Sequence, residues 1–172
     1  MEMDFLMALQ KLHHPVLDRI MVWITVLGNG GWFFILLGVV LIINGKTRKI
    51  GIHVLVSLLF SAILCSLILK GMVARSRPCW IDPNVPLLIK SPRDYSFPSG
   101  HTSAAVAAAC SVLAYNKKYG SMLCALAFCI AFSRMYLFVH FPTDILGGIV
   151  MGIFSAVLAL SAIKYYEKRH PF

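Results

Sequence analysis

Three short stretches of the sequence contain most of the side chains that could perform chemistry. They are KGMVARSRP from Lys70 to Pro78, PSGH from Pro98 to His101, and SRMYLFVHFPTD from Ser133 to Asp144. Each stretch adjoins a long apolar run, where ionisable groups are energetically costly and usually functional. Together they supply cations, imidazoles and a carboxylate, which are the groups needed to bind an anion and react with it.

The first stretch offers two cations. Lys70 and Arg77 are seven residues apart, so they share one face, two turns apart, if the preceding helix continues through both. Two cations on one face can bind a single anion. The alternative is that Lys70 only extends its amine to the membrane surface and Arg77 is a loop charge. The other two stretches favour the anion site.

The second stretch predicts a helix start. Ser99 is the expected N-cap, Gly100 allows close approach to the backbone, and His101 falls in the first turn of a helix that reaches Tyr115. Free N–H groups and the positive dipole end suit a phosphate there. An ordinary capped helix can also begin this way. A protonated histidine, however, gains nothing from the dipole at this end, so His101 indicates an anionic partner or a catalytic task.

The third stretch predicts a histidine–aspartate pair. Arg134 and His140 are six residues apart, so they converge only if the helix ends before His140. Pro142 favours such a break, and it places Asp144 in the first turn of the next helix, within reach of a His140 ring nitrogen. An imidazole oriented by a carboxylate beside several cations is typical of a histidine nucleophile. The alternative is a structural pair.

Composition indicates what kind of scaffold must position these groups. The chain has 172 residues, 59% hydrophobic and only 13% charged, whereas soluble proteins are about a quarter charged. Residues 1–172 are therefore expected to form a single integral membrane domain. Five runs lack Asp, Glu, Lys and Arg, and most approach the roughly 20 residues of a membrane span: 20–45, 50–69, 95–116, 119–133 and 145–163. The N-terminal segment has no features of a cleavable signal peptide.

Four spans are expected, from Ile50 to about Gly71, from Gly100 to Tyr115, from Tyr119 to about Val139, and from Pro142 to about Tyr165. The 29 residues from Val16 to Asn44 would form a helix of about 43 Å, too long for one span and too short for two. The sequence Gly28-Asn29-Gly30-Gly31 predicts a break between a short helix, Pro15 to Leu27, and a short span, Trp32 to Asn44. Residues 3 to 12 form either an interfacial helix or a frayed tail. The expected fold is an all-α polytopic membrane helix bundle with about five to six membrane helices.

Loop charges predict the orientation of the bundle. If the four spans alternate, three basic clusters lie on one side: Lys46, Arg48 and Lys49; Lys117 and Lys118; and Lys164, Lys168 and Arg169. The positive-inside rule makes that side cytoplasmic. The loop from Met72 to Pro98 and the turn at His140 then face outward, so the candidate site is expected at the outer membrane face.

Several classes of partner are not expected. The net charge of +9 is spread in short clusters, without the continuous basic stripe of a nucleic-acid-binding protein. The five cysteines show no CxxC spacing, and all but Cys79 lie in apolar runs, so we expect neither a disulfide nor a cysteine metal site. The sequence offers no carboxylate cluster for magnesium, and no cofactor is expected. The sequence leaves the oligomeric state open.

The motifs Lys-x6-Arg-Pro, Pro-Ser-Gly-His and Ser-Arg-x5-His-x3-Asp, in this order between apolar spans, resemble those of the type 2 phosphatidic acid phosphatase superfamily. All three are intact and cover Lys70 to Asp144. The resemblance implies that Lys70, Arg77, Ser99, Gly100 and Arg134 bind phosphate, His140 attacks phosphorus, Asp144 orients His140 and His101 protonates the leaving oxygen, without a metal. The chain is short for this family and lacks a full additional N-terminal span, which leaves open the lipid groove and the pairing of subunits.

The resemblance implies a lipid phosphate or diphosphate phosphatase that acts through a phosphohistidine. An outward-facing site in a small bacterial-type plasma membrane enzyme favours undecaprenyl diphosphate. The segment HHPVLDRIMVWIT, with Pro15 and Asp18, is also similar to small undecaprenyl-diphosphate phosphatases. Phosphatidylglycerophosphate or phosphatidate is the alternative, and the loop from Cys79 to Phe97 is the expected gate that selects among them.

Three other functional classes share some of these features. The oxyanion pocket resembles that of vanadate-dependent haloperoxidases, but those are large soluble proteins. A channel or transporter could use the same charges for permeation, and flux without phosphate release would identify it. A zinc hydrolase could use His101, His140 and Asp144 as ligands, and its activity would be lost with EDTA and restored by zinc.

Overall fold

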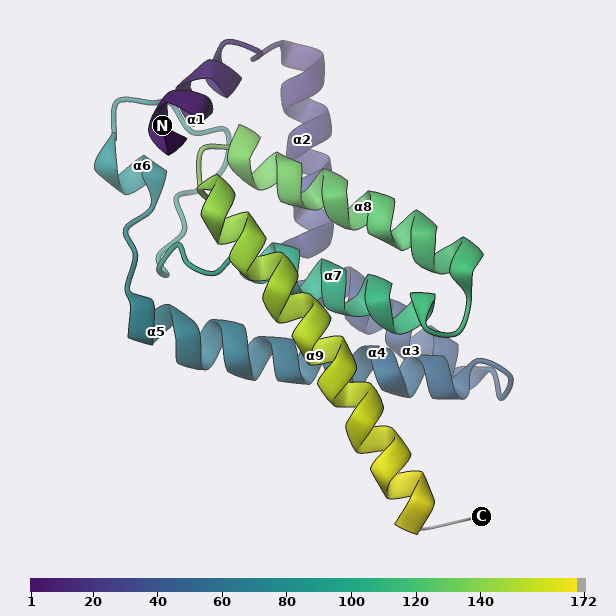
Figure 1. The fold of residues 1–172 in the computed structure, drawn as a ribbon. Coiled ribbons are helices and arrows are strands. Elements are labelled where there is room, and N and C mark those ends of the chain that lie inside the picture. Colours follow the sequence, from purple (N-terminus) through teal and green to yellow (C-terminus); the bar gives the residue numbers. More distant parts are fainter. Residues whose placement is uncertain (170–172) are drawn as a thin grey trace.

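The computed structural model describes residues 1–169, and within them all regular structure is helical (Figure 1). The elements are α1 (Glu2–Gln10), α2 (Pro15–Gly28), η1 (Asn29–Gly31), α3 (Trp32–Ile43), α4 (Arg48–Ser61), η2 (Ala62–Leu69), α5 (Lys70–Val73), α6 (Pro78–Ile81), α7 (Gly100–Leu113), α8 (Lys117–Tyr136) and α9 (Pro142–Arg169). The expected all-α membrane bundle is confirmed.

Four helical stretches are long and apolar enough to cross a membrane, namely Pro15–Ile43, Arg48–Ile81, Lys117–Tyr136 and Pro142–Arg169, the second of which includes the non-helical residues 74–77. The helix Gly100–Leu113 is apolar but shorter. Counting the broken α2–α3 stretch once, residues 1–169 contain four candidate membrane spans and this one shorter apolar helix. In Figure 1 the α3–α4 and α7–α8 turns lie together at the right, whereas α5, α6 and the start of α9 lie at the left.

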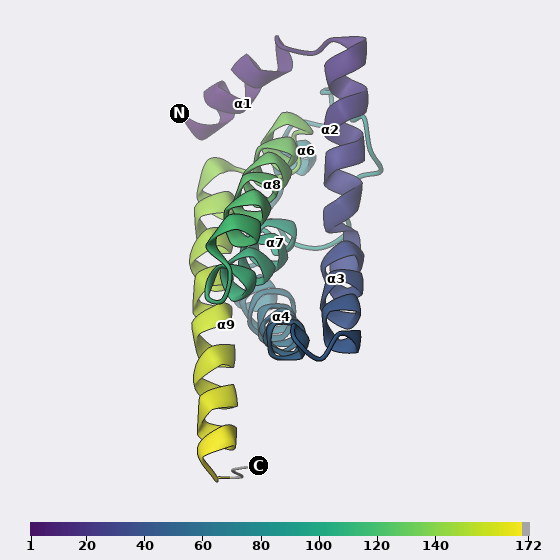
Figure 2. The same ribbon diagram turned by 90° about the vertical axis from the view of Figure 1, so that its right-hand side faces the viewer.

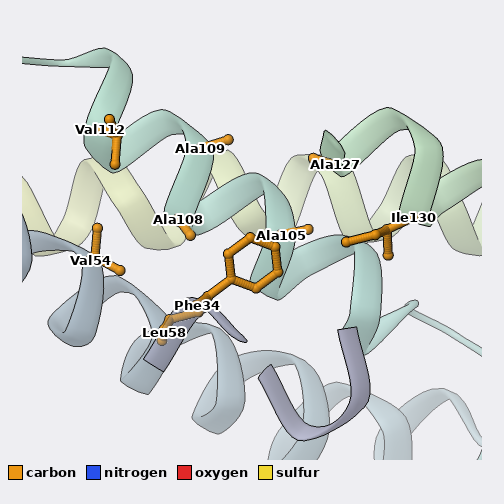
Figure 3. Packing of buried hydrophobic residues seen from close by; sticks show 9 residues of the cluster. All are labelled: Phe34, Val54, Leu58, Ala105, Ala108, Ala109, Val112, Ala127 and Ile130. Atoms are coloured by element: carbon orange, nitrogen blue, oxygen red, sulfur yellow. The ribbon is translucent and has the colours of Figure 1, made fainter. Parts of the chain in front are cut away.

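Helix α7 lies at the centre, where it packs against α4, α8 and α9. Its inner positions carry alanines, which allow these helices to approach closely. The core residues around it are Phe34, Val54, Leu58, Ala105, Ala108, Ala109, Val112, Ala127 and Ile130 (Figure 3). The start of α7, which carries the PSGH motif, is thereby fixed inside the bundle.

Two glycines bring α9 against the start of α7. A Cβ atom at Gly148 would lie 2.7 Å from the Ser99 carbonyl oxygen, and one at Gly152 would lie 2.7 Å from that of Ser103. This spacing of small residues four apart is typical of close membrane helix pairs. The Ser99 N–H also donates a hydrogen bond of 3.0 Å to the Asp144 carbonyl oxygen. The second and third motifs are therefore held in direct contact.

The expected break in the N-terminal stretch is present. Helix α2 ends at Gly28, and α3 begins at Trp32 and follows it along one side of the bundle (Figure 2). Gly30 and Gly31 have positive φ angles of 59° and 70°, a conformation that glycine adopts without steric penalty. The chain can therefore turn between the two helices at Asn29, which is exposed and lines the cavity described below.

Residues 2–10 form helix α1 rather than a frayed tail. Leu6 and Leu9 are buried in a cluster with Tyr136, Phe138 and Phe141, at the end of the bundle where α8 ends and α9 begins. The α1 helix is therefore packed on protein through its apolar face.

The continuous helix that begins at Arg48 includes a π-helical segment, η2, and ends at Val73, because Ala74 has a left-handed φ of 47°. The condition under which Lys70 and Arg77 would share one helix face, a helix that continues through both, is therefore not met. Arg77 follows an irregular segment and caps α6. The physical reason is the left-handed residue, which redirects the chain after Val73.

Candidate active site

Six of the eight residues predicted from the motifs line one cavity of about 1010 Å³. They are Lys70, Arg77, Gly100, His101, Arg134 and His140. The other two, Ser99 and Asp144, are fully buried directly behind them, at 0% exposure. Although Lys70 and Arg77 do not share one helix face, all three motifs converge at one end of the bundle.

The cavity is strongly basic. Its lining includes five cationic side chains, Lys70, Arg77, Lys90, Arg93 and Arg134, and a single carboxylate, Asp94. Residues 89–94 belong to the loop expected to act as a gate, so that loop does form part of the wall. A cavity with this charge suits a multiply charged anion such as a phosphate.

Arg77 is held by several acceptors. Its Nε donates to the Asp94 carbonyl oxygen at 2.7 Å, and its Nη1 donates to the Val139 carbonyl oxygen at 2.7 Å and to His140 Nε2 at 3.1 Å. Only 2% of the residue is exposed. The guanidinium is therefore fixed next to Nε2 of His140, a residue that also lines the cavity.

Asp94 was not predicted as a site residue. Its carboxylate pairs with Lys70 Nζ, and with Arg77 Nη2 at 2.8 Å. Burial raises the pKa of Asp94, but the hydrogen bonds and charges of Lys70 and Arg77 lower it to about 2. Asp94 is therefore ionised at neutral pH. Its carboxylate forms ion pairs with the two cations that an incoming phosphate would contact. The one feature of the sequence that could have indicated Asp94 is that no other Asp or Glu lies between Asp82 and Asp144.

Arg134 approaches the cavity from α8. Its Nη1 donates to Thr25 Oγ1 of α2 at 2.6 Å, whereas its buried Nε has no partner among the described residues. A buried donor without an acceptor is rare in native proteins, because its desolvation is not compensated. An anionic oxygen in the cavity would satisfy it.

His140 and Asp144 are paired as predicted, because α8 ends at Tyr136 and α9 begins at Pro142. His140 Nδ1 lies 3.5 Å from Asp144 Oδ2, which is longer than a good hydrogen bond. Ser96 bridges the two: its Oγ lies 3.4 Å from His140 Nδ1 and donates a short hydrogen bond to Asp144 Oδ2. Since its only hydrogen is used in that bond, Ser96 Oγ can only accept from an Nδ1–H group.

This network fixes the tautomer of His140. A proton on Nδ1 leaves a lone pair on Nε2, which is the nitrogen that accepts from Arg77. Burial lowers the pKa of His140 well below its usual value, and the charges of Arg77, Arg134 and Lys70 lower it further. The imidazole is therefore neutral, and its Nε2 carries no proton but a lone pair that accepts the Arg77 hydrogen bond. Ser96 was not predicted, because a loop serine carries no periodic signal.

His101 is held by the break between α2 and α3. Its Nε2 lies 2.9 Å from Asn29 Oδ1. An amide oxygen accepts hydrogen bonds, so this contact places a proton on Nε2. Gly28 makes room for the ring, since a Cβ atom there would lie 2.6 Å from His101 Cδ2. The glycines predicted the break, but nothing in the sequence predicted that Asn29 would meet His101.

The helix start predicted at Gly100 is present. Ser99 is the N-cap of α7, and its Oγ accepts hydrogen bonds from the Thr102 N–H at 3.5 Å and from Thr102 Oγ1 at 3.0 Å. Gly100 and His101, in the first turn, line the cavity. The positive end of the α7 dipole therefore adds to the charge of the basic side chains.

The donor arrangement does not support the zinc alternative. Within residues 1–169, no group of three or more His, Cys, Asp or Glu side chains is placed to hold a metal ion. Asp144 instead has its oxygens bound by Arg75, Ser96 and the Phe141 N–H. These bonds direct the carboxylate away from the role of a shared metal ligand.

Comparison with known proteins agrees with the fold and the motifs. The sequence model of the PAP2 superfamily matches residues 50–168. Undecaprenyl-diphosphatase BcrC of Bacillus subtilis (strain 168) is 33% identical over 162 residues, which are 93% of this chain and 80% of the relative.

Two crystal structures are similar over nearly the whole chain. LpxE of Aquifex aeolicus has a TM-score of 0.81 at 27% identity, covering 93% of this chain and 94% of that one. A PAP2-type phosphatidylglycerolphosphate phosphatase of Bacillus subtilis has a TM-score of 0.75 at 26% identity, covering 99% and 87%.

The chain therefore belongs to the PAP2 superfamily. It is an integral membrane protein and a hydrolase of the lipid phosphatase type.

Proposed function

We propose that this enzyme removes the terminal phosphate of undecaprenyl diphosphate through a phosphohistidine on His140, without a metal ion. The observation that carries the proposal is that three buried cations, Lys70, Arg77 and Arg134, line the same cavity as a neutral, oriented imidazole, whose Nε2 accepts a hydrogen bond from Arg77. Fixed donors of this kind stabilise the charge on a transferred phosphoryl group, and a metal is not required for that effect.

The other walls of the cavity support a lipid substrate. Ile35 of α3 and Leu55, Leu58 and Leu59 of α4 line the same space as the charged residues. Ile35 and Leu59 are also exposed on the outer surface of apolar helices. A phosphate at the basic end can therefore keep its hydrocarbon chain against α3 and α4, next to the bilayer.

The chemistry proceeds in two displacements. The His140 Nε2 lone pair forms a bond to the terminal phosphorus, and the bond from that phosphorus to the bridging oxygen breaks, its electrons remaining on the departing lipid monophosphate. Water then attacks the phosphohistidine, the P–N bond breaks, and its electron pair returns to His140. His101 protonates the leaving oxygen in the first step and accepts the proton of water in the second.

Undecaprenyl diphosphate is favoured by the similarity to undecaprenyl-diphosphatase BcrC, which covers 93% of the chain at 33% identity. Phosphatidylglycerophosphate is the second candidate, because a PAP2-type phosphatidylglycerolphosphate phosphatase shares the fold over 99% of this chain. Both substrates present a phosphate on a lipid, and the proposed mechanism serves either one.

A phosphate-release assay across purified lipid phosphates, with the enzyme in detergent, tests the proposal. Undecaprenyl diphosphate is expected to show the highest kcat/KM, with a rate unchanged by EDTA. A higher kcat/KM for phosphatidylglycerophosphate or phosphatidate would identify that lipid as the substrate instead of undecaprenyl diphosphate. Loss of the rate in EDTA, with recovery on adding zinc, would replace the metal-free mechanism. Solute flux without any phosphate release would replace the function by transport.

We further propose that the protein lies in a bacterial plasma membrane with the site facing outward. The basic turns on the opposite side support this orientation, because positive loops remain in the cytoplasm. After mutation of Cys79, a cysteine introduced at Asn84 in the site-side loop should react with an impermeant thiol reagent on intact cells. A cysteine at Asn116, before Lys117 and Lys118, should not. The reverse labelling pattern would place the site in the cytoplasm and exclude recycling on the outer face.

The role of His101 as an acid predicts a substrate-dependent effect. A lipid diphosphate expels a phosphate monoester, which leaves readily without a proton, whereas a lipid monophosphate expels an alkoxide that needs one. General-acid catalysis contributes about 10²- to 10⁴-fold. His101→Ala should therefore slow phosphoenzyme formation from a lipid monophosphate by most of that factor and from the diphosphate much less.

Single-turnover measurements are needed for this comparison, because slow hydrolysis of the phosphoenzyme could hide the difference in steady-state rates. If both substrates lose the same factor in the first step, His101 binds or positions phosphate and is not the acid.

A further inference from the structure

Helix α1 is attached at several points to the end of the bundle where α8 ends and α9 begins. Leu6 and Leu9 are buried at 0% and 8% exposure in the cluster beside Tyr136 and Phe141. At the end of the helix, Gln10 Nε2 donates to the Tyr136 carbonyl oxygen at 3.1 Å. The start of α1 is thereby fixed over the turn between α8 and α9, which carries His140.

The first residue of this helix, Glu2, reaches the third motif. Its Oε1 accepts hydrogen bonds from the Thr143 N–H at 3.0 Å and from Thr143 Oγ1 at 2.8 Å. Its Oε2 accepts from Arg75 Nη2 at 2.7 Å. Burial raises the pKa of Glu2, but the hydrogen bonds from Thr143 and the bond and charge of Arg75 lower it below its usual value. The carboxylate is therefore charged and has a partner for each oxygen.

Arg75 connects Glu2 to the catalytic pair. Its Nη1 donates to Asp144 Oδ1 at 2.8 Å and to Thr143 Oγ1 at 2.6 Å, while its guanidinium lies 4.2 Å above the Phe141 ring. Asp144 has 0% exposure, and its other oxygen, Oδ2, faces Ser96 and His140 Nδ1. The rotation of the Asp144 carboxylate is therefore set on the Oδ1 side by Arg75, and the position of Arg75 is set by Glu2.

We propose that Glu2 is a positioning residue for the reaction, and that α1 acts as a clamp that holds Arg75 against Asp144 and so keeps His140 in the Nδ1–H tautomer. Glu2 shares the charge of Arg75. Without Glu2, the Arg75 guanidinium pairs with Asp144 alone. The Asp144 carboxylate then becomes a weaker acceptor for the hydrogen bond from Ser96, the residue that contacts His140 Nδ1. The clamp rests on the proposed function of His140 as a nucleophile.

Glu2→Gln tests the clamp, because glutamine keeps the size of the side chain and removes its charge. Hydrogen-bond partners of metal-binding residues typically contribute about 10- to 100-fold to activity, and we take the same scale for a partner that acts on a catalytic carboxylate. Since a third of the Glu2 side chain is exposed (33%), we expect the lower end, a decrease in kcat of about 10-fold. KM should stay within about twofold, because Glu2 does not line the cavity, and a positioning defect acts on the chemical step.

Asp4→Asn is the matched control. Asp4 is an acid of the same helix whose side chain is 86% exposed, so its neutralisation should leave kcat at the wild-type value. A double-mutant cycle with Arg75→Lys tests the route. If Glu2 acts through Arg75, adding Glu2→Gln to Arg75→Lys should lower kcat by less than about twofold. Additive losses, or an unchanged kcat in Glu2→Gln alone, would overturn the clamp.

A second measurement does not depend on turnover. Nitrogen NMR of ¹⁵N-histidine-labelled protein in lipid nanodiscs distinguishes the two tautomers of His140, with the signal assigned by its loss in His140→Gln. Wild-type protein should show protonated Nδ1, and Glu2→Gln should show an increased share of protonated Nε2. Unchanged tautomers would overturn the clamp. If the wild-type enzyme releases no phosphate from any lipid, the proposed function fails, and the NMR comparison still decides whether Glu2 controls His140.

Discussion

His140→Ala is expected to abolish phosphate release from every lipid phosphate that the wild-type enzyme hydrolyses. The imidazole is 1% exposed, is neutral and presents Nε2 next to Arg77, and no other side chain of the described cavity offers a nucleophile in that position. Removing the nucleophile of an oriented catalytic group typically lowers kcat by on the order of 10⁶-fold. Initial rates of phosphate release from purified protein in detergent would measure the loss.

His53→Ala provides a matched control. His53 is equally buried, at 1% exposure, and its Nε2 bonds to the Ala156 carbonyl oxygen at 2.8 Å, but it does not line the cavity. This variant should lose thermal stability and keep measurable turnover, which separates damage to the fold from loss of the nucleophile.

The His140→Ala variant also tests the covalent intermediate. Wild-type enzyme quenched during turnover of a ³²P-labelled substrate should retain an acid-labile label that maps to His140, and His140→Ala should retain none. Turnover in His140→Ala above that of a mock preparation would remove His140 from the role of nucleophile.

The sequence was sufficient for the parts of the fold that depend on local patterns. The glycines at 28, 30 and 31 predicted the break between α2 and α3, Ser99 predicted the start of α7, and Pro142 predicted the start of α9. Each of these signals acts within one or two turns of helix, where backbone sterics and capping decide the outcome. The three motifs therefore predicted most of the residues that meet in the cavity.

The path of the chain between the helices could not be predicted in the same way. The seven-residue spacing of Lys70 and Arg77 indicated one helix face, but Ala74 adopts a left-handed conformation and ends the helix. Alanine is not a residue that favours this conformation, so no local signal marked the turn. Arg77 reaches the site because the tertiary structure places the loop there.

The partners of the motif residues were also beyond prediction. Asn29 meets His101 from 72 positions away, and Glu2 meets Arg75 from 73 positions away. Ser96 and Asp94 lie in a loop without periodicity. Such polar contacts depend on how the helices pack, and neither hydrophobic periodicity nor turn chemistry carries that information.

Asp144→Asn is expected to slow the reaction by about 10³- to 10⁴-fold while leaving the protein folded, as in other catalytic groups where an aspartate sets a histidine tautomer. The carboxylate is fully buried, and its oxygens accept from Arg75, Ser96 and the Phe141 N–H, all of them donors. An asparagine must direct its NH₂ group at one of these donors.

Either orientation of the asparagine disturbs His140. If the NH₂ group replaces Oδ2, it opposes the Phe141 N–H and the Ser96 hydroxyl, so Ser96 must turn its hydrogen toward His140 and favour the wrong tautomer. If it replaces Oδ1, it opposes Arg75, and the negative charge that stabilises a phosphorylated, cationic imidazole is still lost. Single-turnover rates of phosphoenzyme formation would measure the effect, with size-exclusion elution and thermal unfolding as checks on the fold. A rate equal to that of the wild-type enzyme would make the His140–Asp144 pair structural, because a carboxylate that orients the nucleophile cannot be neutralised without slowing its attack.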